Sequence, residues 1–268
     1  LIDISSKEGM KIYVRTIVYI MGRAFENLYQ REKIMVEYQL GNAMYCKCDN
    51  IEITEEFIKN LKDEMQKIIE KDEKITKVEM TRKEAEKFYE ENNSSRGRLQ
   101  FDLEGNEPIY MYFCGKYYNY CYGTLANRTG IIKIFDVIKY GDGFLIRYPS
   151  SKEPTKMPEF HETKKLAWAL EEFEKIHSVL DVLTVYKLNK AIEEDRIKDV
   201  IMLAEALHEK KIANIADDIA KRKNVKMVLI AGPSSSGKTT FAQRLGIQLR
   251  LNGLKPVTIS VDNYFVER

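Results

Sequence analysis

Histidine, cysteine and tryptophan are scarce in this sequence of 268 residues, which holds three His, four Cys and one Trp. A secreted disulfide scaffold needs far more cysteine, and so few imidazoles and thiols leave little material for a metal centre. The low cysteine content predicts a reducing, cytoplasmic environment. Apolar runs of about 18 residues, the length of a membrane span, are missing, as is a signal-peptide pattern, so no membrane partner is expected.

The sequence also lacks an excess of positive or of negative charge. The 43 Lys and Arg residues nearly balance the 41 Asp and Glu residues, which gives a formal net charge of +2. Net charge alone therefore predicts neither a polyanionic partner nor an anionic surface, and any contact with phosphate or RNA must come from a local site. Hydrophobic residues make up 44% and charged residues 31% of the chain, which excludes a disordered protein.

Residues 1–150 have the mixed patterning of an α+β domain. Apolar residues at helical spacing predict a helix over 16–28, and Thr54 is a candidate N-cap for a second amphipathic helix. From Ile109 onward, short aromatic and β-branched runs separated by glycine-containing turns predict an antiparallel sheet.

A connector is predicted after this domain. Three prolines among polar residues in the string PSSKEPTKMP, from Pro149 to Pro158, are typical of a linker between folded units. The interval from Lys164 to Arg222 has neither proline nor glycine and is helix-compatible throughout. Residues 151–223 are therefore interpreted as a linker and helical connector.

Residues 224–268 have a third pattern. A continuous apolar run over 227–231 predicts a buried parallel strand, a helix is expected over 239–251, and a second strand is expected over 256–261. Strand, glycine-rich turn, helix and strand in this order predict the opening βαβ unit of an α/β domain.

A glycine-rich motif stands between the first of these strands and the helix. Its string GPSSSGKT, from Gly232 to Thr239, matches G-x-x-x-x-G-K-[ST]. Backbone N–H groups of such a loop turn toward a polyphosphate, the Lys238 ammonium contacts the β and γ phosphates and acts at the transition state, and the Thr239 hydroxyl holds Mg²⁺. The motif predicts an ATP and Mg²⁺ site, against the alternative of a chance glycine–serine turn. The predicted cofactor-binding residues are Gly232, Pro233, Ser234, Ser235, Ser236, Gly237, Lys238, Thr239 and Thr240.

A second catalytic candidate, Asp262, follows the second predicted strand. Ligands of open parallel sheets lie beyond the carboxyl ends of the strands, so its carboxylate is expected beside the phosphate loop. There it would accept the proton of an acceptor hydroxyl during phosphoryl transfer. A turn residue or an outer-sphere partner of Mg²⁺ is the alternative interpretation.

The strings GPSSSGKTT and SVDNYF, which begin at Gly232 and Ser260, resemble the start of the uridine kinase and phosphoribulokinase family. The resemblance implies a P-loop kinase that transfers the γ-phosphoryl group of ATP to a sugar hydroxyl of a nucleoside or a similar alcohol. It covers only residues 224–268, so it implies a kinase truncated within its domain and inactive as this fragment. It assigns the general base to Asp262 and the substrate pocket to Asp262, Tyr264 and Phe265.

The string AEALHEKKIA, from Ala204, resembles the helical region that leads into the kinase in a bacterial subgroup with a threonyl-tRNA-synthetase-like N-terminal half. The strings EMQKII, CYG and TGIIKIF further upstream resemble the second additional, editing-type domain of threonyl- and alanyl-tRNA synthetases. Those domains hold a metal with an H-x-x-x-H pair and a C-x-G-x-H run. The corresponding positions here are Thr16, Ile20, Cys121 and Leu125. One thiolate cannot build a zinc site, so the resemblance implies an editing-type fold without hydrolytic chemistry.

The remaining chemistry-bearing residues favour structural roles. The four cysteines lack the spacing of a zinc site, and the three histidines are isolated from one another. Seven aromatic residues between Tyr110 and Tyr122 favour sheet core and cross-strand pairing over base stacking. Two functions are expected as alternatives: a nucleoside kinase fused to a degenerate synthetase-like domain that regulates it or binds RNA, or an ATP- or RNA-binding regulatory module without phosphotransfer.

Overall fold

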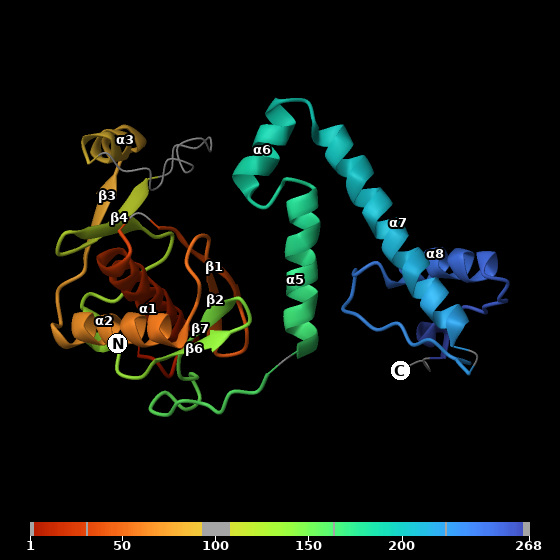
Figure 1. Cartoon of the computed structure of the whole chain (residues 1–268), viewed down its shortest axis with the longest axis horizontal. Helices are drawn as coiled ribbons and strands as arrows, with labels where there is room; N and C mark the ends of the chain where they lie inside the picture. Colours follow the sequence, from red (N-terminus) through yellow and green to blue (C-terminus); the bar gives the residue numbers. More distant parts are fainter. Residues whose placement is uncertain (1–2, 31, 93–107, 163, 223, 265–268) are drawn as a thin grey trace. The chain divides into compact units, whose positions relative to one another are not determined.

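The computed structural model describes residues 3–30, 32–92, 108–162, 164–222 and 224–264 (Figure 1). The chain divides into two compact units, Leu1–Ala169 and Leu170–Arg268, and each is described by itself. Among the described residues, no helix combines the length and apolar character that a membrane crossing requires.

The larger core of the first unit lies between two helices and an antiparallel sheet. The helices are α1 (Lys7–Leu28) and α2 (Glu55–Glu70), and the strands are β1 (Ile34–Gln39), β2 (Ala43–Cys48), β6 (Asp136–Tyr140) and β7 (Gly143–Arg147). The sheet has the strand order β1-β2-β7-β6. Tyr13, Ile17 and Met21 of α1 are almost fully buried against Leu61 and Met65 of α2 and the inner face of the sheet. The α1 and α2 ribbons lie next to each other (Figure 1).

Local sequence signals explain where these helices begin. The Thr54 hydroxyl accepts a hydrogen bond from the Phe57 N–H at 3.1 Å, so the predicted N-cap of α2 is confirmed. Helix α1 begins nine residues earlier than position 16, because the Ser6 hydroxyl caps it by accepting from the Gly9 N–H at 3.0 Å. The helix predicted over 16–28 is therefore confirmed, but it begins earlier than the sequence pattern indicates.

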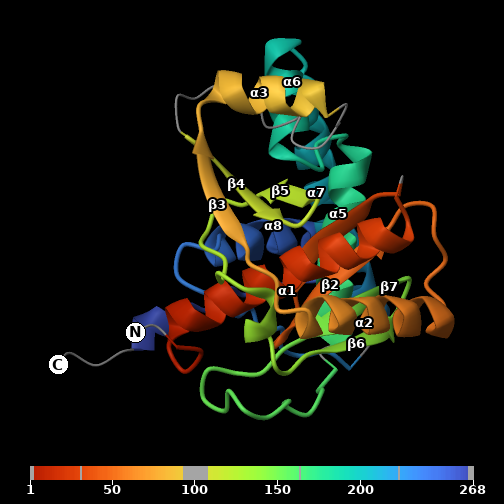
Figure 2. The ribbon, with the colours of Figure 1, turned by 90° about the vertical axis from the view of Figure 1, so that its left-hand side faces the viewer.

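A second, three-stranded antiparallel sheet has helices on both faces. Its strands are β3 (Thr76–Met80), β4 (Ile109–Cys114) and β5 (Tyr117–Tyr120), in the order β3-β4-β5, and α3 (Arg82–Glu91) follows β3 at one end of the sheet (Figure 2). Alternate residues of β4 point to opposite faces. Tyr112 and Cys114 pack in a cluster with Tyr19 of α1, whereas Ile109 and Met111 pack in a cluster with α3. Helix α1 thus contributes to the larger core and to the cluster on one face of the second sheet.

The aromatic run between Tyr110 and Tyr122 has the structural role that its pattern favours. Tyr112 and Tyr117 are 3% and 6% exposed and belong to the cluster beneath α1. The β4–β5 hairpin turns at Gly115, whose φ of +61° is the left-handed conformation that glycine adopts without strain. Tyr122 differs, because 77% of its surface is exposed.

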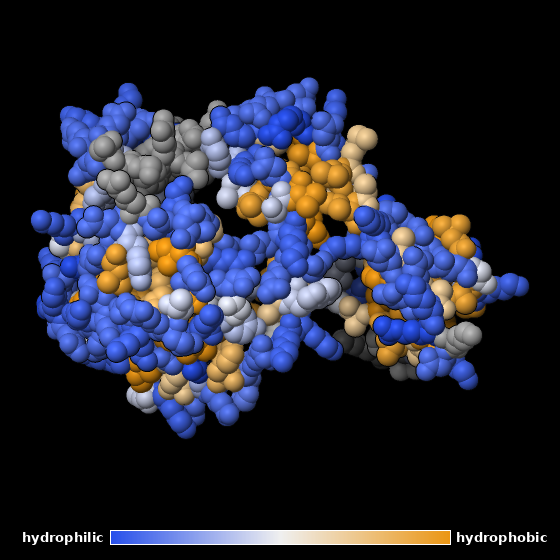
Figure 3. All heavy atoms as spheres, in the orientation of Figure 1, coloured by the Kyte–Doolittle hydropathy of each residue, from blue (hydrophilic) through white to orange (hydrophobic). Residues whose placement is uncertain are grey.

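The second unit consists of helices. They are α5 (Lys164–Val179), which crosses the boundary between the units, α6 (Val185–Glu193), α7 (Ile197–Lys221) and α8 (Lys238–Leu251), with a 3-10 turn, η2 (Val261–Tyr264), near the end. The core joins Ile212 and Ala216 of α7 to Leu245 and Leu249 of α8. Helices α5, α6 and α7 lie in the interval that the sequence pattern describes as helix-compatible, and the helix predicted over 239–251 is confirmed as α8. Figure 3 shows apolar side chains at the surface of this unit.

The parallel strands predicted over 227–231 and 256–261 are wrong, because neither segment forms a strand. A buried parallel strand is stable only with hydrogen-bonded neighbours and helices covering both faces. Here Leu229 and Val257 are 85% and 83% exposed, so their apolar side chains lack that cover. Of the three elements of the predicted βαβ unit, the helix forms, as α8, and the two strands do not.

Candidate functional site

The candidate site lies where α1 meets the segment after β5, residues 121–126. Thr16 is fully buried on α1, and its Oγ1 atom accepts a hydrogen bond from the Ala126 N–H at 2.8 Å. The same hydroxyl donates to the Ile12 carbonyl oxygen at 2.7 Å, one turn earlier in the helix. Thr16 therefore uses its side chain to join the helix to the segment.

The four positions at which the resemblance to editing-type domains would place metal ligands do not form a ligand set in the structure. Thr16 binds backbone groups, Ile20 lies in the core beneath α2, and Leu125 lies in the separate cluster with Tyr19. Cys121 is half-buried at the edge of that cluster. Among the described residues there is no group of three His, Cys, Asp or Glu side chains that could hold a metal ion.

The surface near these buried residues combines an aromatic ring, a guanidinium and the half-buried backbone of Gly123. The Tyr122 ring lies 5.6 Å from the Tyr120 ring, centroid to centroid, and is mostly exposed. At Gly123, a Cβ atom would lie 2.3 Å from the Arg15 Cζ atom, so the guanidinium packs directly on the glycine backbone. The Tyr112 hydroxyl donates to the Gly123 carbonyl at 3.0 Å and holds this backbone in place.

A polar pocket lies two turns further along α1, and no sequence motif predicts it. The Arg23 side chain is largely buried, forms an ion pair with Glu73, and donates from Nη1 to the Cys114 Sγ atom at 2.9 Å. The adjoining hollow, of about 350 Å³, is also lined by Lys116 and Tyr117. Burial raises the pKa of the Cys114 thiol, so the thiol stays protonated at neutral pH. The available signal was a lone arginine on the buried side of an amphipathic helix.

The glycine-rich loop leads into α8. Gly237 caps the helix with a φ of +77°, and the loop from Gly232 to Gly237 is exposed. The Lys238 Nζ atom donates to the carbonyl oxygens of Gly232 and Pro233, at 3.0 and 2.6 Å. The ammonium thus closes the loop on itself, while Thr239 and Thr240 are exposed in the first helical turn.

The predicted partners of this loop are not brought to it by a strand. Asp262 lies in the 3-10 turn η2, and its side chain is outside the described part of the chain. Tyr264, in the same turn, is 74% exposed, and Phe265 lies outside the described residues. The predicted meeting of Asp262 with the phosphate loop therefore stays a prediction.

The known proteins to which the chain is similar are threonine–tRNA ligases, and the similarity covers about half of the chain. No protein-family model matches the chain. The chain is 28% identical over 140 residues, 52% of its length, to a threonine–tRNA ligase of Symbiobacterium thermophilum. It is also 28% identical over 139 residues to a threonine–tRNA ligase of a Geobacillus species, and 31% identical over 144 residues to a probable cytoplasmic threonine–tRNA ligase of Enterocytozoon bieneusi. The matched part spans 22% of each of these relatives.

These matches correct the expected function. The relatives are threonine–tRNA ligases, not phosphotransferases with an alcohol acceptor, so the prediction of a nucleoside kinase of the uridine kinase type is wrong. The prediction of a nucleoside substrate depended on the kinase prediction, so it is unsupported as well. The threonyl-tRNA-synthetase-like part of the resemblance is supported, and the mixed α+β architecture with two antiparallel sheets is consistent with it.

Proposed function

We propose that this protein binds transfer RNA through its first unit and does not hydrolyse an aminoacyl ester there. The observation that carries the proposal is the similarity to threonine–tRNA ligases over about half of the chain. Those relatives act on transfer RNA by name, and an α+β unit with two antiparallel sheets is the part of this chain suited to the same partner.

The surface formed by Arg15, Tyr122 and Gly123 supports the binding role. Single-stranded RNA is recognised by stacking of its bases on aromatic rings and by contacts of its phosphates with cations and backbone N–H groups. Tyr122 offers an exposed ring, and Arg15 offers a guanidinium held against the backbone of Gly123. The three groups therefore suit one unpaired nucleotide and its phosphate.

The buried layer beneath this surface supports the absence of hydrolysis. A metal-dependent site needs neutral imidazoles, thiolates or carboxylates around an ion with an open position. The Thr16 hydroxyl instead accepts a hydrogen bond from the Ala126 N–H, and Ile20 and Leu125 are aliphatic and buried. Within the described part of the chain, no group of ligands joins the Cys121 thiol to form a metal site.

The test is binding of a labelled threonine transfer RNA transcript, followed by fluorescence anisotropy. Stacking on an aromatic side chain is worth about 1–3 kcal/mol per base, so Tyr122→Ala should raise the Kd by about 5- to 150-fold. Tyr264→Ala is the matched control, because Tyr264 is equally exposed and lies in the other unit. Equal effects of the two variants would contradict the proposal, as would release of the amino acid from a charged transcript.

A second candidate function concerns the glycine-rich loop of the second unit. We infer that it binds the phosphates of ATP, with Lys238 as the phosphate cation and Thr239 as the residue that would hold Mg²⁺. The left-handed Gly237 and the exposed start of α8 support this, since helix N-termini preceded by glycine-rich loops attract anions. The Gly232 and Pro233 carbonyls now accept from Lys238, so a bound phosphate would have to replace them. This role is binding alone, without phosphotransfer.

A further inference from the structure

Strand β3 lies at an edge of its sheet. It pairs with β4 and with no other strand in the part of the chain that the structure describes. Its residues from Thr76 to Glu79 are exposed, and 36% of the Val78 surface is accessible to solvent. An exposed edge presents a row of backbone N–H and C=O groups with which another strand can pair.

The side chains of this edge are complementary to a second copy of the same edge. Lys77 and Glu79 flank Val78 and lie on one face, where the Lys77 Nζ atom is 3.5 Å from the ring centroid of Tyr110, the residue opposite Glu79. An antiparallel copy of β3 centred on Val78 places each Lys77 opposite the Glu79 of the other copy. Directly opposed charges of opposite sign stabilise an antiparallel pair.

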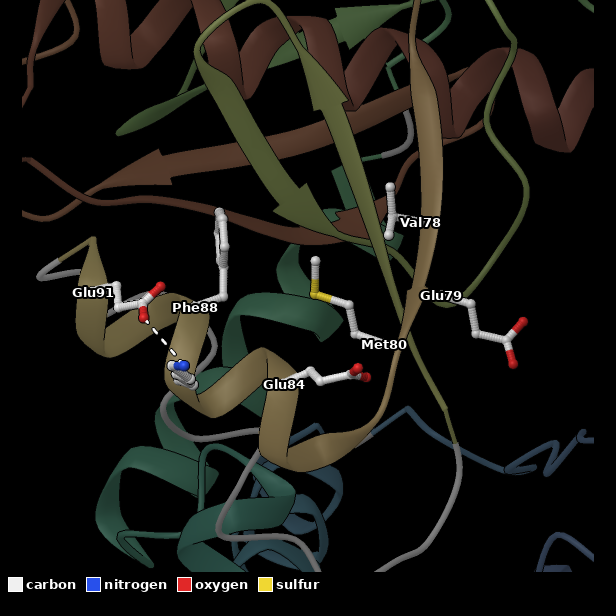
Figure 4. Close-up of a pocket in the computed structure, with 7 residues that line it drawn as sticks. Val78, Glu79, Met80, Glu84, Phe88 and Glu91 are labelled. Atoms are coloured by element: carbon white, nitrogen blue, oxygen red, sulfur yellow. Dashed lines mark ion pairs between the residues drawn. The ribbon is translucent and has the colours of Figure 1, made fainter.

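The other face of the edge offers apolar surface. Val78, Met80 and Phe88 point into the same hollow between β3 and α3, of about 330 Å³, and Glu79 points away from it (Figure 4). The charged side chains at the rim of the hollow include Lys87, whose ammonium pairs with Glu91 at 3.7 Å. A second β3 centred on Val78 would bring its own Val78 to this hollow and cover the apolar side chains.

The other edge strands that the structure describes lack this complementarity. Strand β1 has one charged residue, Glu37, and a bulge after Val36 that interrupts its edge. Strand β5 has no charged residue. In β6, Asp136 and Lys139 stand three residues apart and so point to opposite faces.

We propose that two copies of this chain associate through antiparallel pairing of their β3 strands, with Val78 at the two-fold axis. The two three-stranded sheets then form one continuous six-stranded sheet, and two Lys77–Glu79 pairs close the junction. Five residues per strand bury little area, so the dimer is weak and dissociates on dilution. High salt weakens it further by screening the exposed charge pairs.

The test is a charge-reversal series measured by analytical ultracentrifugation of the full chain from low to high micromolar concentration. Lys77→Glu places carboxylates opposite carboxylates, and Glu79→Lys places ammonium groups opposite ammonium groups. Each variant alone should raise the dimer Kd by about tenfold or more. An equimolar mixture of the two variants should dimerise like the unaltered chain, because every opposed pair is again of opposite sign. Recovery in the mixture also shows that both variants are folded.

The matched control is Val36→Lys, which alters a valine of similar exposure, 38%, on the edge strand β1. It should leave the dimer Kd unchanged. Three results would overturn the proposal: an unaltered chain that stays monomeric at every concentration, single charge variants that dimerise as well as the unaltered chain, or a mixture that remains monomeric.

Discussion

The Thr16 Oγ1 atom lies 2.8 Å from the Ala126 backbone nitrogen and accepts its hydrogen bond, although 110 positions separate the two residues. Both residues are buried, so water cannot replace either partner. The contact holds the middle of α1 against the segment that carries Tyr122 and Gly123. It therefore couples the stability of the unit to the shape of the proposed RNA-binding surface.

Thr16→Val should destabilise the first unit by about 1–3 kcal/mol, because the buried Ala126 N–H loses its acceptor. Thr16→Ser keeps the hydroxyl and should recover part of this loss. Urea unfolding followed by circular dichroism measures the difference. Thr124→Val is the control at an exposed threonine of the same segment, and it should stay within about 0.5 kcal/mol of the unaltered chain. Equal losses at Thr16 and Thr124 would contradict the role of this bond.

Gly123→Ala should weaken binding of the threonine transfer RNA transcript with little change in stability. The added methyl group would overlap the Arg15 guanidinium, which is the far end of a flexible side chain and can move aside. Moving it takes the cation away from the backbone where a phosphate would bind. Anisotropy titration and urea unfolding of the same variant separate the two effects. Unchanged RNA affinity would remove Arg15 from the proposed surface.

Lys238→Ala should weaken the binding of Mg²⁺-ATP to the chain by about 10- to 150-fold, the equivalent of a charge-assisted hydrogen bond of about 1.5–3 kcal/mol. Isothermal titration calorimetry measures the affinity. The control is Lys255→Ala, which removes an exposed ammonium from the same unit outside the loop. If both variants bind alike, or if the unaltered chain does not bind Mg²⁺-ATP, the loop has no phosphate-binding role.

The stability of the first unit should fall as pH rises above the ordinary pKa of a thiol, about 8.5. Burial, with help from the carboxylates of Asp49 and Glu32, raises the pKa of the Cys48 thiol to about 12. Between these two values the unfolded chain loses the Cys48 proton and the folded chain keeps it, so alkali favours unfolding. Below about pH 8.5 the contribution is fully present.

Guanidinium unfolding at a series of alkaline pH values measures this decline. Cys48→Ala removes the titrating group, so its stability should fall less steeply with pH than that of the unaltered chain. Parallel curves for the two proteins would show that the Cys48 thiol does not contribute to the decline.

Predictions that depend on short stretches of sequence agree with the structure. The N-cap of α2 at Thr54, the helix after Gly237 and the hairpin turn at Gly115 all follow from groups within a few residues of one another. Helix capping and left-handed glycine are local effects, so they need no knowledge of the rest of the chain. The strands predicted over 227–231 and 256–261 failed, because a strand depends on partners that its own sequence does not specify.

The candidate site could be predicted only in part. The Cys121 run and the absence of histidine at positions 16, 20 and 125 can be read from the sequence, and they predict a domain without that metal site. The packing of Arg15 on Gly123 and the bonds from Arg23 to Cys114 and Glu73 could not be predicted. The residues of these pairs are 50 or more positions apart in the sequence, and they meet through the packing of both sheets on α1.

By itself, the sequence determined the balance of charge, the helix cap at Thr54 and the alternating faces of β4, because each depends on residue identity and local spacing. Tertiary structure alone decided that Thr16 bonds to Ala126, that Tyr122 is exposed among buried tyrosines, and that β3 stands at an edge. The physical reason is that a residue's burial and its hydrogen-bond partners depend on how the elements pack together. In the first unit, α1 packs against both sheets, so its position decides which residues of each sheet are buried beneath it.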